Sequence, residues 1–161
     1  MSTLAPALAA APELQPIHPP PASFLRRYVF SEDHKVIARQ FLWAGLVFLL
    51  LGGSLAMLIR WQWAYPGRQV PLVGGILLPA SGGVIGPATY QTLFTSHGLI
   101  MIFFAITPIL IGAFGNFTIP LEIGARDMAF PKLNMLSFWT FALSQALVLL
   151  SFLADLGGGG A

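Results

Sequence analysis

The stretch that decides the fold is residues 41–59, FLWAGLVFLLLGGSLAMLI, which is nineteen consecutive residues without a charge. At about 1.5 Å of rise per residue, a helix of this length nearly crosses a hydrocarbon core of roughly 30 Å. Basic residues lie on both sides of the stretch, at Lys35, Arg39 and Arg60. Their long side chains can reach the lipid headgroups while their stems stay in the apolar region. The stretch is therefore predicted to be a transmembrane helix.

Two further runs, 90–121 and 133–154, also lack Asp, Glu, Lys and Arg. The first of them contains Pro108, Gly112 and Gly115, which membrane helices tolerate where neighbouring groups satisfy the backbone. The sequence predicts an all-α integral membrane protein with three transmembrane helices. Their expected positions are about 36–61, 89–118 and 133–155. The loop between the first two, roughly 61–88, is rich in Gly and Pro and is predicted to form turns rather than a fourth span.

The composition agrees with a membrane protein. Hydrophobic residues make up 56% of the chain and charged residues 9%, whereas an ordinary soluble domain carries about 25% charged residues. A formal net charge of only +2 leaves no basic face for nucleic acid. The absence of cysteine excludes disulfides, iron–sulfur clusters and thiolate-bound haem or zinc.

The distribution of charge predicts how the chain crosses the membrane. Residues 1–25 are rich in Ala and Pro, hold no apolar run, and are predicted to be a disordered cytoplasmic tail ahead of the membrane part, 26–161. Only Arg60 and Arg68 fall in or beside the first loop. The other basic residues lie before the first span or between the second and third: Arg26, Arg27, Lys35, Arg39, Arg126 and Lys132. The positive-inside rule therefore places the N-terminus in the cytoplasm and the first loop outside.

His97 is the first candidate functional residue. It lies in FTSHGLIMIFF, about two helical turns inside the second span. An ionisable residue at that depth is costly and is a functional hypothesis by default. A neutral imidazole is a standard axial ligand of haem iron. The alternative is a histidine that hydrogen-bonds a neighbouring helix, and the position alone does not separate the two.

Arg60 lies at the outer end of the first span, which is antiparallel to the second. It is therefore expected at a depth similar to that of His97. A guanidinium there can donate hydrogen bonds to an oxygen on the edge of a haem ring. The alternative role is that of an interfacial arginine that extends toward the headgroups.

Asp127 lies on the opposite side of the membrane, in the loop IGARDMAFPKLNML. Asn116 and Asn134 flank it in sequence at the same cytoplasmic level. A carboxylate with amide neighbours at the membrane surface can collect protons and pass them to ordered water. The alternative is a solvated acid paired with Arg126 or Lys132.

Two long runs carry a family resemblance. SEDHKVIARQFLWAG, at 31–45, and YQTLFTSHGLIMIFFAITPILIGAFGNFTIPLEIGARDMAFPKLNMLSFW, at 90–139, closely resemble subunit I of the haem–copper oxygen reductases, of which cytochrome c oxidase is the best-known member. The resemblance covers about residues 30–160 apart from part of the first outer loop. It implies that the chain is the N-terminal part of a twelve-helix bundle.

The resemblance implies a haem site in the outer half of the membrane. His97 matches one of the two axial histidines of the low-spin haem. Arg60 matches the arginine that interacts with the formyl group of that haem in A-type members, which implies haem a. Tyr90 matches a tyrosine near the same haem.

The resemblance also implies a proton channel on the cytoplasmic side. Asp127 matches the aspartate at the mouth of that channel, and Asn116 and Asn134 match asparagines that hold water just inside it. Family members often have a second asparagine after Asn134, where this chain has Met135. That departure is expected to alter hydration of the channel mouth.

Full-length members reduce oxygen to water, with proton pumping, at a second haem paired with copper. That centre needs more histidines than the three in this chain, His18, His34 and His97, of which only His97 matches a ligand. The chain is therefore interpreted as an N-terminal fragment that is inactive alone. The implied surroundings are oxidase subunits II and III, cytochrome c as electron donor, and the bilayer of a bacterial plasma membrane.

Three alternatives stay open. A quinol oxidase subunit I of the same superfamily shares the loop and the histidine, and nothing in this segment decides the electron donor. A small haem b membrane anchor pairs histidines across its own helices, and this chain offers no second intramembrane histidine. A transporter bundle, in which His97 lines a substrate path, would bind no haem.

Overall fold

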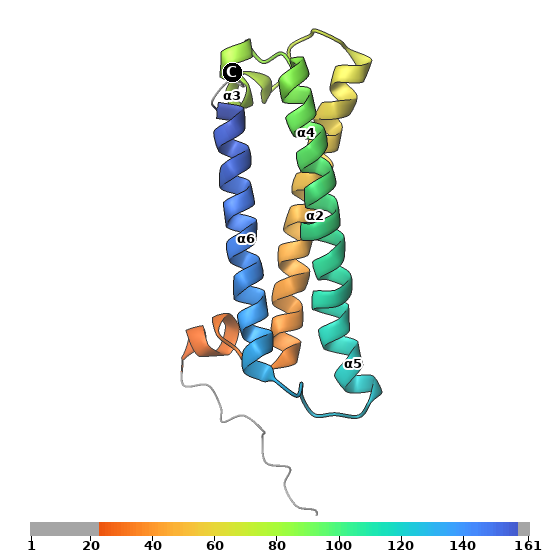
Figure 1. Cartoon of the computed structure of the whole chain (residues 1–161), viewed down its shortest axis with the longest axis vertical. Coiled ribbons are helices and arrows are strands. Elements are labelled where there is room, and N and C mark those ends of the chain that lie inside the picture. The colour runs from red at the N-terminus through yellow and green to blue at the C-terminus, as the bar shows by residue number, and fades with distance from the viewer. Residues whose placement is uncertain (1–22, 158–161) are drawn as a thin grey trace, which may run out of the picture.

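The computed structural model describes residues 23–157 and shows three long helical rods lying side by side (Figure 1). The rods are formed, in order, by α2 (His34–Ala64); by α4 (Pro87–Leu99), η3 (Ile100–Ile106), η4 (Pro108–Gly115) and α5 (Asn116–Glu122); and by α6 (Pro131–Gly157). By length and composition, three helices are able to cross a membrane. The predicted all-α membrane fold with three transmembrane helices is confirmed.

Helix starts follow from local sequence. The carboxylate of Asp33 accepts a hydrogen bond from the Lys35 amide at 2.8 Å and so caps α2. The second and third rods begin with Pro87 and Pro131. Proline suits the first helical position because its φ is already helical and its missing N–H would have no helical partner there.

A short helix, η1 (Leu25–Val29), precedes α2. Gln40 Nε2 donates to the carbonyl oxygens of Tyr28 and Val29 at 2.6 and 3.0 Å, and Trp139 Nε1 donates to that of Val29 at 3.1 Å. These bonds attach η1 to the first and third rods. Most of the predicted disordered tail, residues 1–22, lies outside the described residues.

The second rod remains helical through its proline and glycines, but its turns widen to π-helical geometry in η3 and η4. Pro108 has no N–H to donate to the preceding turn. The Thr107 hydroxyl donates to the Ile102 carbonyl at 2.7 Å and satisfies one backbone acceptor there. This is the compensation by which membrane helices tolerate proline.

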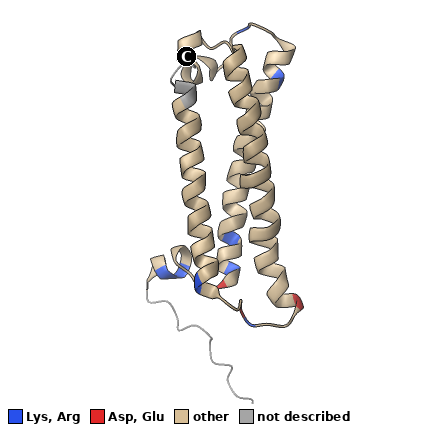
Figure 2. Ribbon diagram, viewed as in Figure 1, with Lys and Arg blue, Asp and Glu red and all other residues tan. Residues whose placement is uncertain are grey.

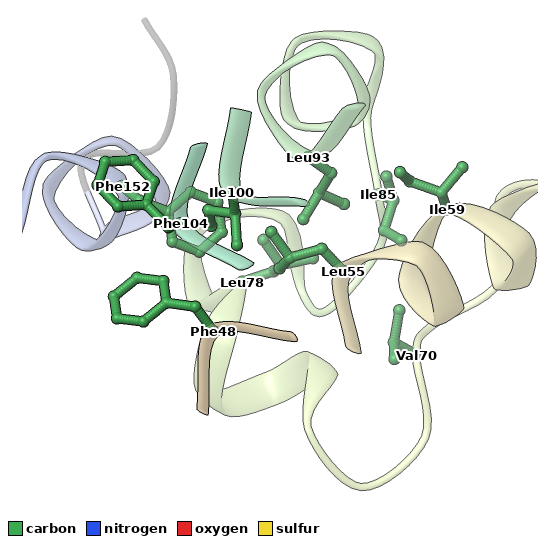
Figure 3. Close-up of a cluster of buried hydrophobic side chains, with 10 residues drawn as sticks. All are labelled: Phe48, Leu55, Ile59, Val70, Leu78, Ile85, Leu93, Ile100, Phe104 and Phe152. Atoms are coloured by element: carbon green, nitrogen blue, oxygen red, sulfur yellow. The ribbon is translucent and has the colours of Figure 1, made fainter. Parts of the chain in front are cut away.

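The core lies between the rods in two clusters. The larger one lies toward the end that holds the loop between α2 and α4, and Leu55, Leu78 and Ile100 lie near its centre (Figure 3). The smaller one, toward the opposite end, consists of Ile37, Phe41, Ala113 and Phe138. Many other large apolar side chains face outward, as expected for a surface that meets lipid.

The outer loop folds back onto the bundle. It contains α3 (Gly74–Leu77), η2 (Pro79–Ser81) and an isolated antiparallel bridge between Gln69 and Val84. Its buried residues Val70, Leu78 and Ile85 join the larger cluster. No helix in the described loop is long enough to span a membrane, which agrees with the predicted turns.

Charged residues lie at the two ends of the described bundle, and the middle is free of them (Figure 2). The end that holds η1 and the α5–α6 loop carries most of the Lys and Arg residues as well as Asp127 and Glu122. The other end carries Arg60 and Arg68. A bilayer around the uncharged middle would meet no charged side chain.

Candidate functional site

His97 lies on the last turn of α4, and its side chain is half-buried. Its Nδ1 lies 2.9 Å from the carbonyl oxygen of Gly52 on α2. A carbonyl oxygen only accepts hydrogen bonds, so the ring carries its proton on Nδ1 and donates it. Nε2, the other ring nitrogen, has no hydrogen-bond partner in the described part of the chain, and in the neutral form of the ring it carries a lone pair.

This arrangement fits a haem better than a bare metal ion. Histidines that bind metals usually donate their other ring N–H to a carbonyl or carboxylate, as His97 does. Within residues 23–157, no group of three or more His, Cys, Asp or Glu side chains converges to hold an ion. A haem brings its own ring of nitrogen ligands and needs only axial ones, so a single imidazole is a sufficient contribution from this segment.

Arg60 lies further out than expected. His97 is level with Gly52, eight residues before Arg60, and eight residues correspond to about 12 Å along a helix. The expectation of similar depth is wrong because the two spans overlap with an offset of about two turns. Arg60 is exposed near the C-terminal end of α2, where only a ligand that extends from His97 toward that end would meet its guanidinium.

Tyr90 lies two turns before His97 on the same face of α4. Trp63, in the last turn of α2, donates from Nε1 to the Tyr90 hydroxyl oxygen at 2.9 Å. The Trp63–Tyr90 hydrogen bond joins the end of α2 to the start of α4, and Trp63 follows Arg60 by three residues. Tyr90 also packs against the larger core cluster, and its own O–H remains available as a donor.

At the end of the bundle that holds η1, Asp127 is bound to His34. The Asp127 Oδ1 lies 2.9 Å from His34 Nδ1, and the two side chains are 11% and 3% exposed. The Met128 amide donates to the same oxygen at 2.7 Å. The carboxylate is not the solvated acid of the expected alternative, because the loop turns it inward onto the first turn of α2.

Asn116 and Asn134 come together at a cavity of about 290 Å³ between the rods. Thr107 and Ser137 add hydroxyl groups to its otherwise apolar lining. Asn116 Nδ2 donates to the Gly112 carbonyl at 2.8 Å, whereas the buried Nδ2 of Asn134 has no partner among residues 23–157. Asp127 does not line this cavity. The two asparagines therefore share one site, and the aspartate contacts His34 at another.

Comparison with known proteins identifies the family of this chain. Residues 36–161 match the family described as Cytochrome C and Quinol oxidase polypeptide I. The chain belongs to this family. It is thus a subunit I polypeptide of the haem–copper oxidase type, and with its three apolar helices it is a multi-pass membrane protein.

Named members of the family are similar over most of the chain. Cytochrome c oxidase subunit 1 of Thermostichus vulcanus is 41% identical over 138 residues, which are 86% of this chain and 22% of that protein. The protein of the same name from Mytilus edulis is 39% identical over 137 residues, 85% of this chain and 22% of that one. The Heme-copper oxidase subunit I+III of Aeropyrum pernix is 38% identical over 135 residues, which are 84% of this chain and 15% of that protein. The chain therefore spans about a fifth or less of the length of these relatives.

Sequence reasoning missed two residues that contact the candidate residues Asp127 and His97. His34 was assigned no role, because it matches no haem ligand, although its position at the start of a span, level with the Asp127 loop, was a usable signal. Gly52 gave no signal, because the group that contacts His97 is its backbone carbonyl, and every residue has one.

Proposed function

We propose that the chain is the N-terminal part of a cytochrome c oxidase subunit I. In the full-length protein, electrons from cytochrome c pass through a low-spin haem to a haem–copper centre that reduces oxygen to water, with proton pumping. The observation that carries the proposal is the His97 imidazole, held through Nδ1 by Gly52 with Nε2 left over, in a chain of this family.

In this proposal His97 would hold haem a through Nε2. The haem, when bound, would supply one-electron redox chemistry. Gly52 fixes the tautomer of the His97 ring, the Arg60 guanidinium would donate hydrogen bonds to an oxygen of the haem, and Tyr90, fixed by Trp63, would lie beside it. The ligands of the second haem and of the copper belong to parts of the subunit that this chain does not contain.

Proton uptake is assigned to the opposite side. Asp127 collects protons at the cytoplasmic surface, and Asn116 and Asn134 hold water in the cavity between the rods. The unpartnered Asn134 Nδ2 supports this role, because buried polar groups of this kind bind ordered water. Electrons and protons that enter from opposite sides store roughly 2.3 kcal/mol per charge for each 100 mV of membrane potential.

The proposal places the protein in a bacterial plasma membrane, with the N-terminus in the cytoplasm and with oxidase subunits II and III as partners. The six basic residues toward one end support this orientation. A quinol oxidase subunit I is a second candidate, because the family description covers both donors.

The decisive experiment uses the full-length subunit in its assembled complex. His97→Ala is expected to abolish the low-spin haem bands in the reduced-minus-oxidised spectrum, because one of the two axial ligands is gone. The neighbouring substitution Ser96→Ala serves as the matched control and should leave the spectrum intact.

Other results would assign another function. A wild-type spectrum with b-type bands alone would favour the quinol oxidase or a haem b anchor. A protein without haem would favour a transporter, and an unchanged spectrum in His97→Ala would remove the basis of the proposal.

A further inference from the structure

The contact between α2 and the second span at Gly52 leaves no room for a Cβ atom without a shift of its neighbours. A Cβ atom added to Gly52 would lie 2.7 Å from the Met101 sulfur and 3.1 Å from Ile100 Cγ2. Ile100 is only 1% exposed, so it has little room to move. A glycine is therefore what allows the two spans to approach each other beside His97.

The same residue provides the partner of the histidine. Within α2, the Gly52 carbonyl is positioned to accept the usual helical bond from the amide four residues on. A carbonyl oxygen has two lone pairs, and the second accepts from His97 Nδ1 at 2.9 Å. The bond spans two helices, so its length depends directly on how closely their backbones approach.

We propose that Gly52 is the positioning residue of the His97 imidazole. It acts twice, since its missing side chain brings the helices together and its carbonyl fixes the tautomer and the rotation of the ring. Nε2 is thereby held toward the haem iron. The inference rests on the proposed haem role of His97. It states that the orientation of the imidazole is set by α2, through Gly52, and not by the helix that carries the histidine.

The bond also affects the electronic properties of the ligand. Donation from Nδ1–H to an acceptor raises the basicity of a metal-bound imidazole. A more basic ligand favours the oxidised iron and lowers the reduction potential. Lengthening the bond is therefore expected to raise the potential of the low-spin haem, an effect that a loss of packing alone would not produce.

The chain contains two matched controls. Gly53 is the next residue on the same helix, and a Cβ added there would meet nothing within 4 Å. Gly45 packs against the same second span, where its Cβ would lie 2.5 Å from Ile109 Cγ1 and 3.2 Å from the Ala105 carbonyl oxygen. Gly53→Ala thus tests the change in helix propensity, and Gly45→Ala tests crowding of the spans away from His97.

The experiment compares Gly52→Ala with these two controls in the full-length oxidase. The measurements are the midpoint potential of the low-spin haem by redox titration and its low-temperature electron paramagnetic resonance spectrum, which responds to the orientation of the imidazole plane. We expect Gly52→Ala to raise the potential and shift the spectrum, and both controls to match the wild type.

If Gly52→Ala assembles poorly, the double variant Gly52→Ala with Met101→Ala restores room where the contact is tightest and should return the spectrum toward that of the wild type. A Gly52→Ala protein that matches Gly53→Ala, or a Gly45→Ala protein with the same shift, would overturn the inference. Retention of the low-spin haem in His97→Ala would instead overturn the proposed function itself, so the two failures are distinguishable.

Discussion

His34 and His97 use the same ring atom at the same distance, yet they lie in opposite parts of the molecule and have opposite kinds of partner. His34 Nδ1 is 2.9 Å from the carboxylate of Asp127 at the cytoplasmic end. His97 Nδ1 is 2.9 Å from the neutral backbone carbonyl of Gly52 within the apolar part of the bundle. The first ring is almost fully buried and the second is half-buried.

The difference shows how a partner sets what an imidazole can do. A carboxylate is a charged acceptor and binds the ring strongly. A backbone carbonyl is a neutral acceptor that holds Nδ1 as the donor and leaves Nε2 without that bond. The two histidines of the bundle thus differ in the kind of hydrogen-bond acceptor that orients them.

Asp127→Leu removes the partner of His34 and leaves that of His97 in place. It should have the largest effect on stability. The substitution leaves the His34 ring, 3% exposed, with only the Asp33 carboxylate 3.9 Å from Nδ1. Loss of a hydrogen bond to a charged partner costs about 1.5–3 kcal/mol. The apparent melting temperature of the full-length subunit should fall, while the low-spin haem bands stay.

Glu122→Leu is the matched control, because Glu122 is an exposed acid at the same end of the bundle. Its effect should stay within about 0.5 kcal/mol. Equal destabilisation by the two substitutions would show that the His34–Asp127 bond contributes nothing specific. Loss of the haem bands in Asp127→Leu would show that the two regions are not independent.

Replacing Asn116 and Asn134 in turn tests which of the two side chains stabilises the end of the bundle that holds η1. Asn116→Leu removes the bond to the Gly112 carbonyl and should destabilise the protein by about 0.5–1.5 kcal/mol. Asn134→Leu removes a buried donor that has no partner among the described residues and should destabilise the protein less than Asn116→Leu. Thermal unfolding of the two variants checks this order, and a larger loss in Asn134→Leu would contradict it.

Trp63→Phe, near the C-terminal end of α2, should have the smallest effect on stability. It removes the donor to the Tyr90 hydroxyl but keeps most of the ring, so a loss of about 0.5 kcal/mol is expected. Trp43→Phe, on a tryptophan that is also largely exposed, is the control and should leave the melting temperature unchanged. A change in the low-spin haem spectrum in Trp63→Phe alone would show that this bond also supports the haem-binding half.

The sequence by itself determined the three spans, the turns of the outer loop and the concentration of basic residues toward one end. These features depend on local hydropathy and charge, because lipid forces each crossing segment to satisfy its own backbone. The sequence also identified His97 and Asp127 as candidates, since an ionisable residue at the depth of His97 requires a reason.

Only the tertiary structure decided which groups meet. His34 and Asp127 are 93 residues apart, and Gly52 and His97 are 45 apart. The offset between antiparallel spans, which places His97 level with Gly52 and not with Arg60, depends on how side chains and glycines interdigitate along two helices. Such packing is a property of two surfaces together, so neither helix's sequence contains it alone.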